Sequence, residues 1–238
     1  MIKYFPITLF SYNRPDHLTK VLNHMIKSSN IKNYKIFLFC DGPKNNFDEI
    51  KIKKIKEIIN SNKKKLNFDK IFFRKNNIGL ANNVIKSLNY VFSKNEASIV
   101  IEDDIVLGKY ALDFINHYLN VLNNNKKIGS VSAYSYLKNF KQNNNSLNYY
   151  LTKRHSSWAW GTWKRVWYNI NWDEDYKINF LSNETSSSNF NDLGNDMKLM
   201  LWGQKNNYIN SWAVRFNYYC HQYNLKSFQS WESKIENI

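Results

Sequence analysis

Residues 98–107 read SIVIEDDIVL, and this stretch decides the fold that the sequence predicts. The run from Ser98 to Ile101 is typical of a buried strand, and Glu102, Asp103 and Asp104 follow it at once. Three adjacent carboxylates repel one another at the end of such a strand, so a positive partner must compensate them. The nature of that partner is the first question that the sequence poses.

Apolar strands and amphipathic helices alternate on both sides of this stretch. Strands are predicted within residues 4–10, 34–40, 68–74, 97–102 and 128–134, and a helix follows each of the first four. This alternation indicates right-handed βαβ crossovers, and therefore an α/β fold with a mostly parallel, doubly wound sheet. Ligands of such sheets bind outside the carboxyl ends of the strands, which is where the acidic run falls.

The composition favours a single large domain with a strong positive charge. Of 238 residues, 43% are hydrophobic, which allows a sizeable core, and the formal net charge is +15. Such an excess attracts nucleic acid, anionic lipid headgroups or phosphorylated substrates without choosing among them. Cys40 and Cys220 form neither a disulfide framework nor a zinc pattern. With no signal peptide and no apolar run of about 18 residues, we expect a cytoplasmic protein.

A divalent metal ion is one candidate partner for the acidic run. Mg²⁺ and Mn²⁺ take oxygen ligands, and one or two carboxylates with substrate phosphates complete their shell. On an extended chain Glu102 and Asp104 point to one side and Asp103 to the other. One acid could then hold the metal while another contacts substrate. A solvated turn at the strand end is the alternative, and the spacing alone leaves both open.

Five segments together resemble nucleotide-sugar glycosyltransferases with the GT-A fold, of the N-acetylglucosaminyltransferase I type and the bacterial surface-polysaccharide type. They occur in the family's order and cover roughly residues 4–170: PITLFSYNRPDHLTKVL, IFLFCDGPKN, NIGLANNVI, VIEDDIVLGKYALDFINHYL and SSWAWGTWKRVW. The resemblance implies a nucleotide-sugar-binding half at residues 1–138 and an acceptor-side half of the same GT-A domain at residues 139–238.

The resemblance also implies an activity. It is the transfer of a sugar, with inversion, from a nucleotide diphosphate sugar, expected to be a UDP-sugar, to a glycan acceptor in bacterial surface polysaccharide or lipooligosaccharide synthesis. The sugar would be a hexose or an N-acetylhexosamine, and Mn²⁺ or Mg²⁺ would be the cofactor.

Site residues follow from the same resemblance. Asp104 matches the direct metal ligand, and Asp41 would accept a hydrogen bond from the uracil imide. The remaining residues implied in nucleotide-sugar binding are Ser11, Asn13, Arg14, Asn77, Gly79, Leu80, Asn83, Glu102, Asp103 and Trp158.

The aromatic segment around residue 160 combines rings with polar groups, as sugar sites do. Trp160, Trp163 and Trp167 have helical spacing and are predicted to lie in the core. Trp158 precedes that predicted helix and is the better candidate for lining a sugar pocket. His155 could be a polar group of the pocket or a structural histidine. A nearby arginine, Arg154, could offset diphosphate charge or lie on the surface.

An inverting transferase needs a general base, and the sequence leaves its identity open. In the animal enzymes that the chain resembles, an acid follows a tryptophan near the acceptor. The matching stretch here, NSWAVRF, has Ala213 and Val214 instead. Asp192 and Asp196 are the nearby acids, and Asp196 is the favoured candidate. The alternative for Asp196 is an acid at a helix N-terminus, where the helix dipole stabilises it.

Seven lysines fall within residues 51–65, interleaved with isoleucines. The isoleucines could cover the sheet while the lysines stay in water. Alternatively, the basic face could lie on an anionic membrane, each well-placed Lys contributing roughly 1 kcal/mol, which would suit a lipid-linked acceptor.

Two other functions compete with the transferase. A sugar-phosphate nucleotidyltransferase can share this sheet, but PITLFSYNRP lacks the glycine-rich phosphate loop expected of one. A basic nucleic-acid-binding module fits the charge, but the sequence has no RNP, helix-turn-helix or zinc pattern. We therefore expect no nucleic-acid partner. A degenerate transferase that binds sugar nucleotide without turnover is also compatible with the missing base.

Overall fold

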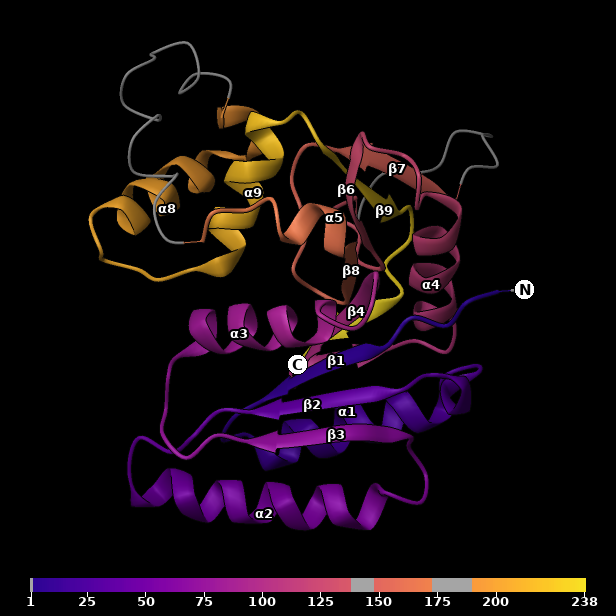
Figure 1. Ribbon diagram of the computed structural model, residues 1–238, viewed down its shortest axis with the longest axis vertical. Helices are drawn as coiled ribbons and strands as arrows, with labels where there is room; N and C mark the ends of the chain where they lie inside the picture. Colours follow the sequence, from indigo (N-terminus) through magenta and orange to yellow (C-terminus); the bar gives the residue numbers. More distant parts are fainter. Residues whose placement is uncertain (1, 138–147, 173–189) are drawn as a thin grey trace.

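The computed structural model describes residues 2–137, 148–172 and 190–238 (Figure 1). An eight-stranded sheet with strand order β3-β2-β1-β4-β8-β6-β9-β7 carries the fold, and helices flank it. A separate two-stranded sheet pairs β5 with β10. The α/β class and the mostly parallel sheet that the sequence predicts are confirmed.

The first half of the sheet is wholly parallel. The strands are β1 (Ile7–Ser11), β2 (Ile36–Cys40), β3 (Phe68–Phe73) and β4 (Ala97–Glu102). Helices α1 (Pro15–Lys27), α2 (Asn46–Asn62) and α3 (Leu80–Phe92) connect them in turn, and a 3₁₀ turn, η1 (Ile31–Asn33), precedes β2. Strands β1, β2 and β4 are almost continuous apolar runs, which is typical of strands buried on both faces.

Helix α2 is the lysine-rich helix. Ile52, Ile55 and Ile59 are buried, whereas the lysines between Lys51 and Lys65 are exposed. These isoleucines pack inward and the lysines lie in water, an arrangement that fits both readings of the helix.

The second half of the sheet contains an antiparallel strand that the sequence analysis did not predict. Strand β8 (Trp160–Trp163) lies between β4 and β6 (Ile128–Ser132) and is antiparallel to both. The predicted helix through Trp160 and Trp163 is therefore wrong, and only Trp167 lies in a helix, the single turn α5 (Lys164–Trp167). The predicted burial of all three rings is correct.

The pairing of β8 with two strands explains this difference. On a strand, Trp160 and Trp163 point to opposite faces, and both faces are covered here. Trp160 stacks on Trp212 at 5.1 Å, while Trp163 Nε1 donates to the Leu119 carbonyl at 3.1 Å. A Cβ at Gly161 would meet Leu119 Cδ1 at 2.8 Å, so any larger residue would have to displace side chains of α4 (Ala111–Val121), which packs against this strand.

The remaining elements complete the second half of the large sheet, the helices beside it and the small two-stranded sheet. They are β5 (Ile105–Leu107), α4 (Ala111–Val121), β7 (Tyr149–Thr152), η2 (Asn191–Leu193), α8 (Asn195–Lys205), α9 (Trp212–Gln222), β9 (Lys226–Ser230) and β10 (Ile235–Asn237). Because β8 and β9 belong to the same sheet as β4, the two predicted halves share one sheet. The predicted boundary at residue 138 lies outside the described residues. Among the described helices, none has the length and apolar character to cross a membrane.

Candidate active site

A pocket of about 230 Å³ opens at the carboxyl ends of β1, β2 and β4. Nine of the predicted nucleotide-sugar residues line it: Ser11, Arg14, Asp41, Asn77, Gly79, Leu80, Asn83, Glu102 and Asp103. The lining also includes Phe10, Tyr12 and Lys44, which the sequence analysis did not single out. The pocket lies on the edge of the sheet where the doubly wound topology predicts a ligand.

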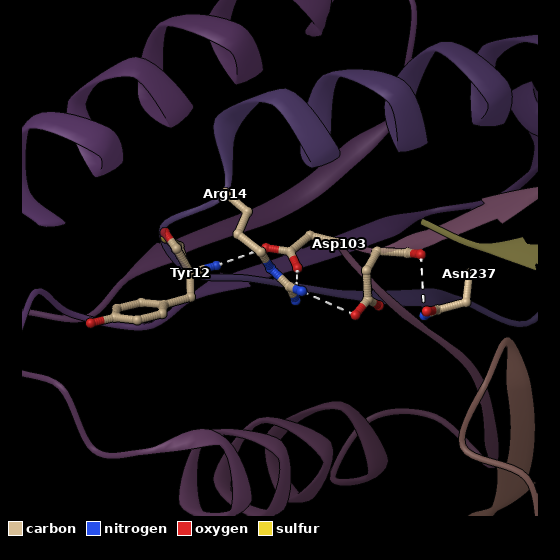
Figure 2. A network of polar contacts seen from close by, with 6 residues as sticks. Tyr12, Arg14, Asp103 and Asn237 are labelled. Atoms are coloured by element: carbon tan, nitrogen blue, oxygen red, sulfur yellow. Dashed lines mark hydrogen bonds and ion pairs between the residues drawn. The ribbon is translucent and has the colours of Figure 1, made fainter.

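Arg14 is the positive partner of the acidic run. Its Nη2 lies 2.5 Å from Asp103 Oδ1, and its Nη1 lies 3.1 Å from Asp104 Oδ2. The backbone N–H of Tyr12 donates to the other Asp103 oxygen at 3.1 Å (Figure 2). Burial raises the pKa of Asp103, and the guanidinium and this N–H oppose that rise. The loop after β1 thus holds the turn after β4.

The expected directions of the three acids are wrong. Strand β4 ends at Glu102, and Asp103 and Asp104 form a turn before β5, so the alternation of an extended chain stops. Asp103 and Asp104 share one guanidinium as a result. Glu102 has a different environment: burial, reinforced by the charges of Asp104 and Asp103, raises its pKa to about 8. This shift favours the protonated form of the carboxyl, which can donate a hydrogen bond.

The acidic turn fits a divalent ion only together with a substrate. No cluster of three or more His, Cys, Asp or Glu suited to a metal occurs in the part of the chain that the structure describes. Asp103 and Asp104 offer two neighbouring carboxylates, and the Asp104 side chain is the more accessible, 21% exposed against 3%. A hard cation held by one or two carboxylates completes its shell with phosphate oxygens and water. To bind that cation, the Asp104 carboxylate must first release Arg14, with which it is paired in this structure.

The C-terminal strand supports this turn from the outside. The backbone N–H of Ile238 donates to the Asp104 carbonyl at 3.0 Å, next to a longer contact from Asn237 Nδ2 at 3.5 Å. These bonds continue the antiparallel pairing of β10 with β5. They fix the backbone of Asp104 and leave its carboxylate for other partners.

Asp41 joins the end of β2 to the start of α3. Its Oδ1 accepts from the N–H groups of Gly42 at 2.9 Å and Ile78 at 3.1 Å, and its Oδ2 accepts from Gly79 at 3.0 Å. Gly79 has a φ of 80°, which favours glycine at this turn. A carboxylate has about four acceptor sites, so capacity for one further donor remains.

Asn77 and Asn83 have structural partners within this pocket. Asn77 Nδ2 donates to the Gly42 carbonyl at 2.9 Å, and Asn83 Oδ1 accepts from Arg74 Nε at 2.7 Å. Leu80, in contrast, is 55% exposed. The asparagines therefore shape the wall of the pocket, while Leu80 offers a free apolar surface.

Asp48 organises the loop after β1, and the sequence analysis missed it. Its carboxylate accepts from the Tyr12 hydroxyl at 2.5 Å, Asn13 Nδ2 at 2.6 Å and the Lys44 N–H at 3.0 Å. These bonds lower its pKa to about 2. Asn13 is thus turned toward Asp48 and does not line the pocket. The sequence does contain a signal for a helix N-terminus at this point, because Asp48 stands three residues after Asn45, the N-cap of α2.

A second pocket, of about 290 Å³, shares no lining residue with the first and includes Trp158 of the aromatic segment. Its lining consists of Tyr134, Tyr136, Arg154, His155, Ser156, Ser157, Trp158, Met197, Met200, Ala213, Val214 and Asn217. Trp158 and His155 therefore belong to this second pocket. Trp158 is not among the residues that line the first pocket, with which the sequence analysis had grouped it.

Asp196 is held in an ion pair. Arg154 donates to both of its oxygens, at 2.7 Å and 2.8 Å, and this bonding lowers the pKa of Asp196. The other nearby acid, Asp192, is paired with Lys153. A carboxylate already engaged by a guanidinium is a weaker base, so the geometry does not favour Asp196 in that role, and its assignment stays a prediction.

The sheet order, the pocket at the carboxyl ends and the acidic turn define a GT-A fold, as the sequence predicted. Among solved structures, the chain is similar to residues 1–349 of S. aureus TarS in complex with UDP, with a TM-score of 0.50 and 14% identity over 70% of this chain and 48% of that one. A longer TarS structure has a TM-score of 0.48 and 13% identity, over 71% of this chain and 30% of that one.

A third similar structure is the mannosyltransferase PcManGT from Pyrobaculum calidifontis in complex with GDP-Man and Mn²⁺, with a TM-score of 0.47 and 9% identity over 71% of this chain and 48% of that one. The chain thus spans less than half the length of these structures. No protein-family model and no curated protein matches the sequence. Identities this low establish the fold and leave the activity to be argued from the site.

Proposed function

We propose that this protein is a glycosyltransferase that uses a nucleotide diphosphate sugar. The observation that carries the proposal is the acidic turn after β4, at the carboxyl edge of a GT-A sheet. Asp103 and Arg14 line the pocket there, and Asp104, which is not among the lining residues, pairs with the same guanidinium. A diphosphate needs positive charge around it, and Arg14 and Lys44 line this pocket. The TarS structure that the chain resembles holds UDP.

UDP is the proposed nucleotide because of Asp41. This carboxylate is buried at the end of β2, and its three backbone bonds hold it in one orientation. A fixed acceptor at this position suits the imide N–H of uracil. The sugar and the diphosphate would then extend toward Glu102, Asp103 and Arg14 on the neighbouring strands.

Mn²⁺ or Mg²⁺ is the proposed cofactor, with Asp104 as its ligand and Asp103 beside it. Such an ion, when bound, stabilises negative charge on a departing diphosphate. The chain's own residues orient the donor: Arg14 can turn from Asp104 to a phosphate oxygen, and the carboxyl of Glu102 can hydrogen-bond a ribose or sugar hydroxyl.

The acceptor, in this proposal, is a glycan, including a lipid-linked one, of bacterial surface polysaccharide or lipooligosaccharide. The transferred sugar is a hexose or N-acetylhexosamine, with inversion at its anomeric carbon. The exposed lysines of α2 would allow peripheral contact with the anionic inner face of the cytoplasmic membrane.

A thermal-shift panel of UDP-, GDP- and CMP-sugars, each with and without Mn²⁺, tests the proposal. At a hundredfold excess over Kd, a ligand adds about 2.7 kcal/mol of stability, or a Tm shift of roughly 5–10 °C. We expect that shift with UDP-sugars and Mn²⁺ together. Asp104→Asn should remove the part that depends on Mn²⁺, whereas Asp69→Asn, at a surface ion pair with Lys35, should not. No shift with any sugar nucleotide would refute the proposal.

A further inference from the structure

We propose that helix α8 and the turn after it bind the surface of an anionic lipid bilayer. The inference rests on the proposed function only for its purpose, which is to reach a lipid-linked acceptor, and it adds an apolar anchor to the lysine contact proposed for α2. Three features of the molecule carry it: apolar side chains on the outer face of α8, an aromatic stack fixed at its end, and the positive charge beside them.

Helix α8 is apolar on two of its faces. Met197 and Leu201 on the inner face are buried in a cluster that includes residues of α9. Leu199 and Trp202 lie on the outer face and are 72% and 55% exposed. These two residues are three apart, so they are neighbours on the helix surface. An exposed apolar face of this kind marks an interaction surface, because water does not stabilise it.

The turn after α8 fixes a second ring on this outer face. The backbone N–H of Tyr208 donates to the Gly203 carbonyl at 2.8 Å. The N–H of Asn207 donates to the Gln204 carbonyl at 3.3 Å, and Asn207 has a φ of 61°, so the helix ends in a Schellman motif. This motif turns the chain back, and the Tyr208 ring, 73% exposed, stacks on Trp202 with centroids 5.2 Å apart at 21°. The stack is therefore held in place although water surrounds it.

Positive charge lies beside the stack. Lys198 and Lys205 stand four residues before and three residues after Trp202, so both flank it on the helix surface. The one acid in the sequence of α8, Asp196, is already paired with Arg154. The sequence of the turn, residues 206–211, contains no acid. The outer face of α8 therefore offers cations and apolar groups, and it complements a partner that is anionic and apolar.

An anionic bilayer fits this chemistry better than a second copy of the chain. Two copies, each with a formal net charge of +15, would bring like charges together at this face. Trp and Tyr favour the boundary between lipid headgroups and hydrocarbon, where the ring is in apolar surroundings and its N–H or O–H reaches water. Lysines beside such rings extend their ammonium groups to anionic headgroups. This combination is typical of an interfacial helix, which lies on a membrane and does not span it.

A second exposed apolar site lies on the same side of the molecule. Phe47 and Ile50, at the start of α2, are 78% and 59% exposed, and the lysines of this helix and Glu49 are exposed beside them. The start of α2 and helix α8 both lie on the side toward which β1, β2 and β3 point (Figure 1). The first pocket opens at the carboxyl ends of the parallel strands. A bilayer that contacts both sites would therefore lie on the side of the first pocket, where a lipid-linked acceptor is needed.

Binding to lipid vesicles tests the inference. Leu199→Glu and Trp202→Glu place a carboxylate on the outer face of α8, and Trp202→Phe keeps an apolar ring there. Val121→Glu is the matched control, because it makes the same change of charge at a residue that is 62% exposed at the end of α4, on the opposite side of the molecule (Figure 1). Co-sedimentation of the full chain is measured with vesicles of phosphatidylcholine alone and with vesicles that also contain phosphatidylglycerol. Circular dichroism and Tm establish that each variant is folded, and UDP binding is titrated without vesicles.

We expect the wild-type protein, Trp202→Phe and Val121→Glu to bind the vesicles that contain phosphatidylglycerol, and to bind phosphatidylcholine alone more weakly. Leu199→Glu and Trp202→Glu should bind the anionic vesicles more weakly than Val121→Glu by about tenfold or more, because each puts a charge where apolar contact with lipid is required.

Equal vesicle binding of the α8 variants and Val121→Glu would overturn the inference, as would equal binding of the wild-type protein to both kinds of vesicle. Self-association of the lipid-free protein that Trp202→Glu abolishes, measured by analytical ultracentrifugation, would assign the face to a second copy instead and overturn the inference as well. UDP binding without vesicle binding would overturn the membrane surface alone. Vesicle binding without any sugar-nucleotide binding would refute the proposed function and leave the membrane surface standing.

Discussion

Replacement of Arg14 by glutamine is the sharpest perturbation of the acidic turn. In the free protein Arg14 occupies the carboxylate that the proposed metal requires, since Nη1 lies 3.1 Å from Asp104 Oδ2. The Arg14 side chain is 42% exposed, so its attraction to Asp104 is screened and amounts to about 1 kcal/mol at most. Removing this competitor should tighten Mn²⁺ binding to the nucleotide-free protein by up to about fivefold.

The same substitution should have a second, opposite effect. Asp103 is almost fully buried and would lose its guanidinium partner, keeping only the Tyr12 N–H. We expect a loss of roughly 1–3 kcal/mol of unfolding free energy without metal, less than for a fully buried pair because Arg14 is partly solvated. Saturating Mn²⁺ should recover part of it. With UDP present, Arg14→Gln should weaken binding, because the diphosphate loses a cation.

Isothermal titration with Mn²⁺, with and without UDP, and urea unfolding measure these effects. Lys35→Gln is the matched control, because it also removes one positive charge, from a surface pair with Asp69. Equal or weaker Mn²⁺ affinity of nucleotide-free Arg14→Gln relative to Lys35→Gln would refute the competition between arginine and metal. It would also remove the reason for assigning the metal to Asp104.

Three further predictions concern stability. Burial lowers the pKa of His155 to about 3, below the ordinary value near 6.5. The free energy of unfolding should therefore be highest above pH 6.5 and fall as the pH decreases, by about 2 kcal/mol at pH 5. Urea unfolding at pH 7.5 and 5.0 should show a smaller loss in His155→Gln, and an equal loss in both proteins would contradict this prediction. Gly161→Ala should lower the free energy of unfolding in urea by about 1–3 kcal/mol, because the new Cβ would meet Leu119 and Ile115 within 3 Å. Gly203→Ala is the control: its nearest new contact is 3.6 Å, so stability should change by less than about 1 kcal/mol. Equal losses in the two variants would argue against the packing explanation. Asp41→Asn should lower stability by roughly 1–3 kcal/mol and weaken UDP binding, because the amide replaces an acceptor by a donor beside backbone N–H groups. If thermal unfolding and UDP titration are both unchanged, Asp41 holds neither the turn nor the uracil base.

The parallel half of the sheet could be read from the chain without a structure. Its strands are short apolar runs, its helices have apolar residues at helical spacing, and both patterns depend on neighbours in sequence. The order of strand and helix then restricts the topology, because βαβ crossovers are right-handed. Nine residues of the first pocket were implied by the resemblance to GT-A glycosyltransferases, whereas the topology alone predicts only the edge of the sheet where a ligand binds.

Strand β8 could not be predicted from local pattern. The residues from Trp160 to Trp163 have helical spacing, yet they fill a gap between two strands that lie far away in the sequence. Burial on both faces of the sheet overrides intrinsic preference in such a position. The second pocket brings together distant residues such as Tyr134, Trp158 and Met197, and so it too was decided by tertiary structure.

The sequence by itself determined the α/β alternation, the buried strands and the presence of three acids at a ligand-binding edge. Only the tertiary structure decided the partners of those acids and of Asp196. Arg14 reaches Asp103 because β1 and β4 are neighbours in register, and Arg154 reaches Asp196 across 42 residues. Periodicity is set by adjacent residues, whereas an ion pair between distant residues is set by strand order and register, which no local pattern contains.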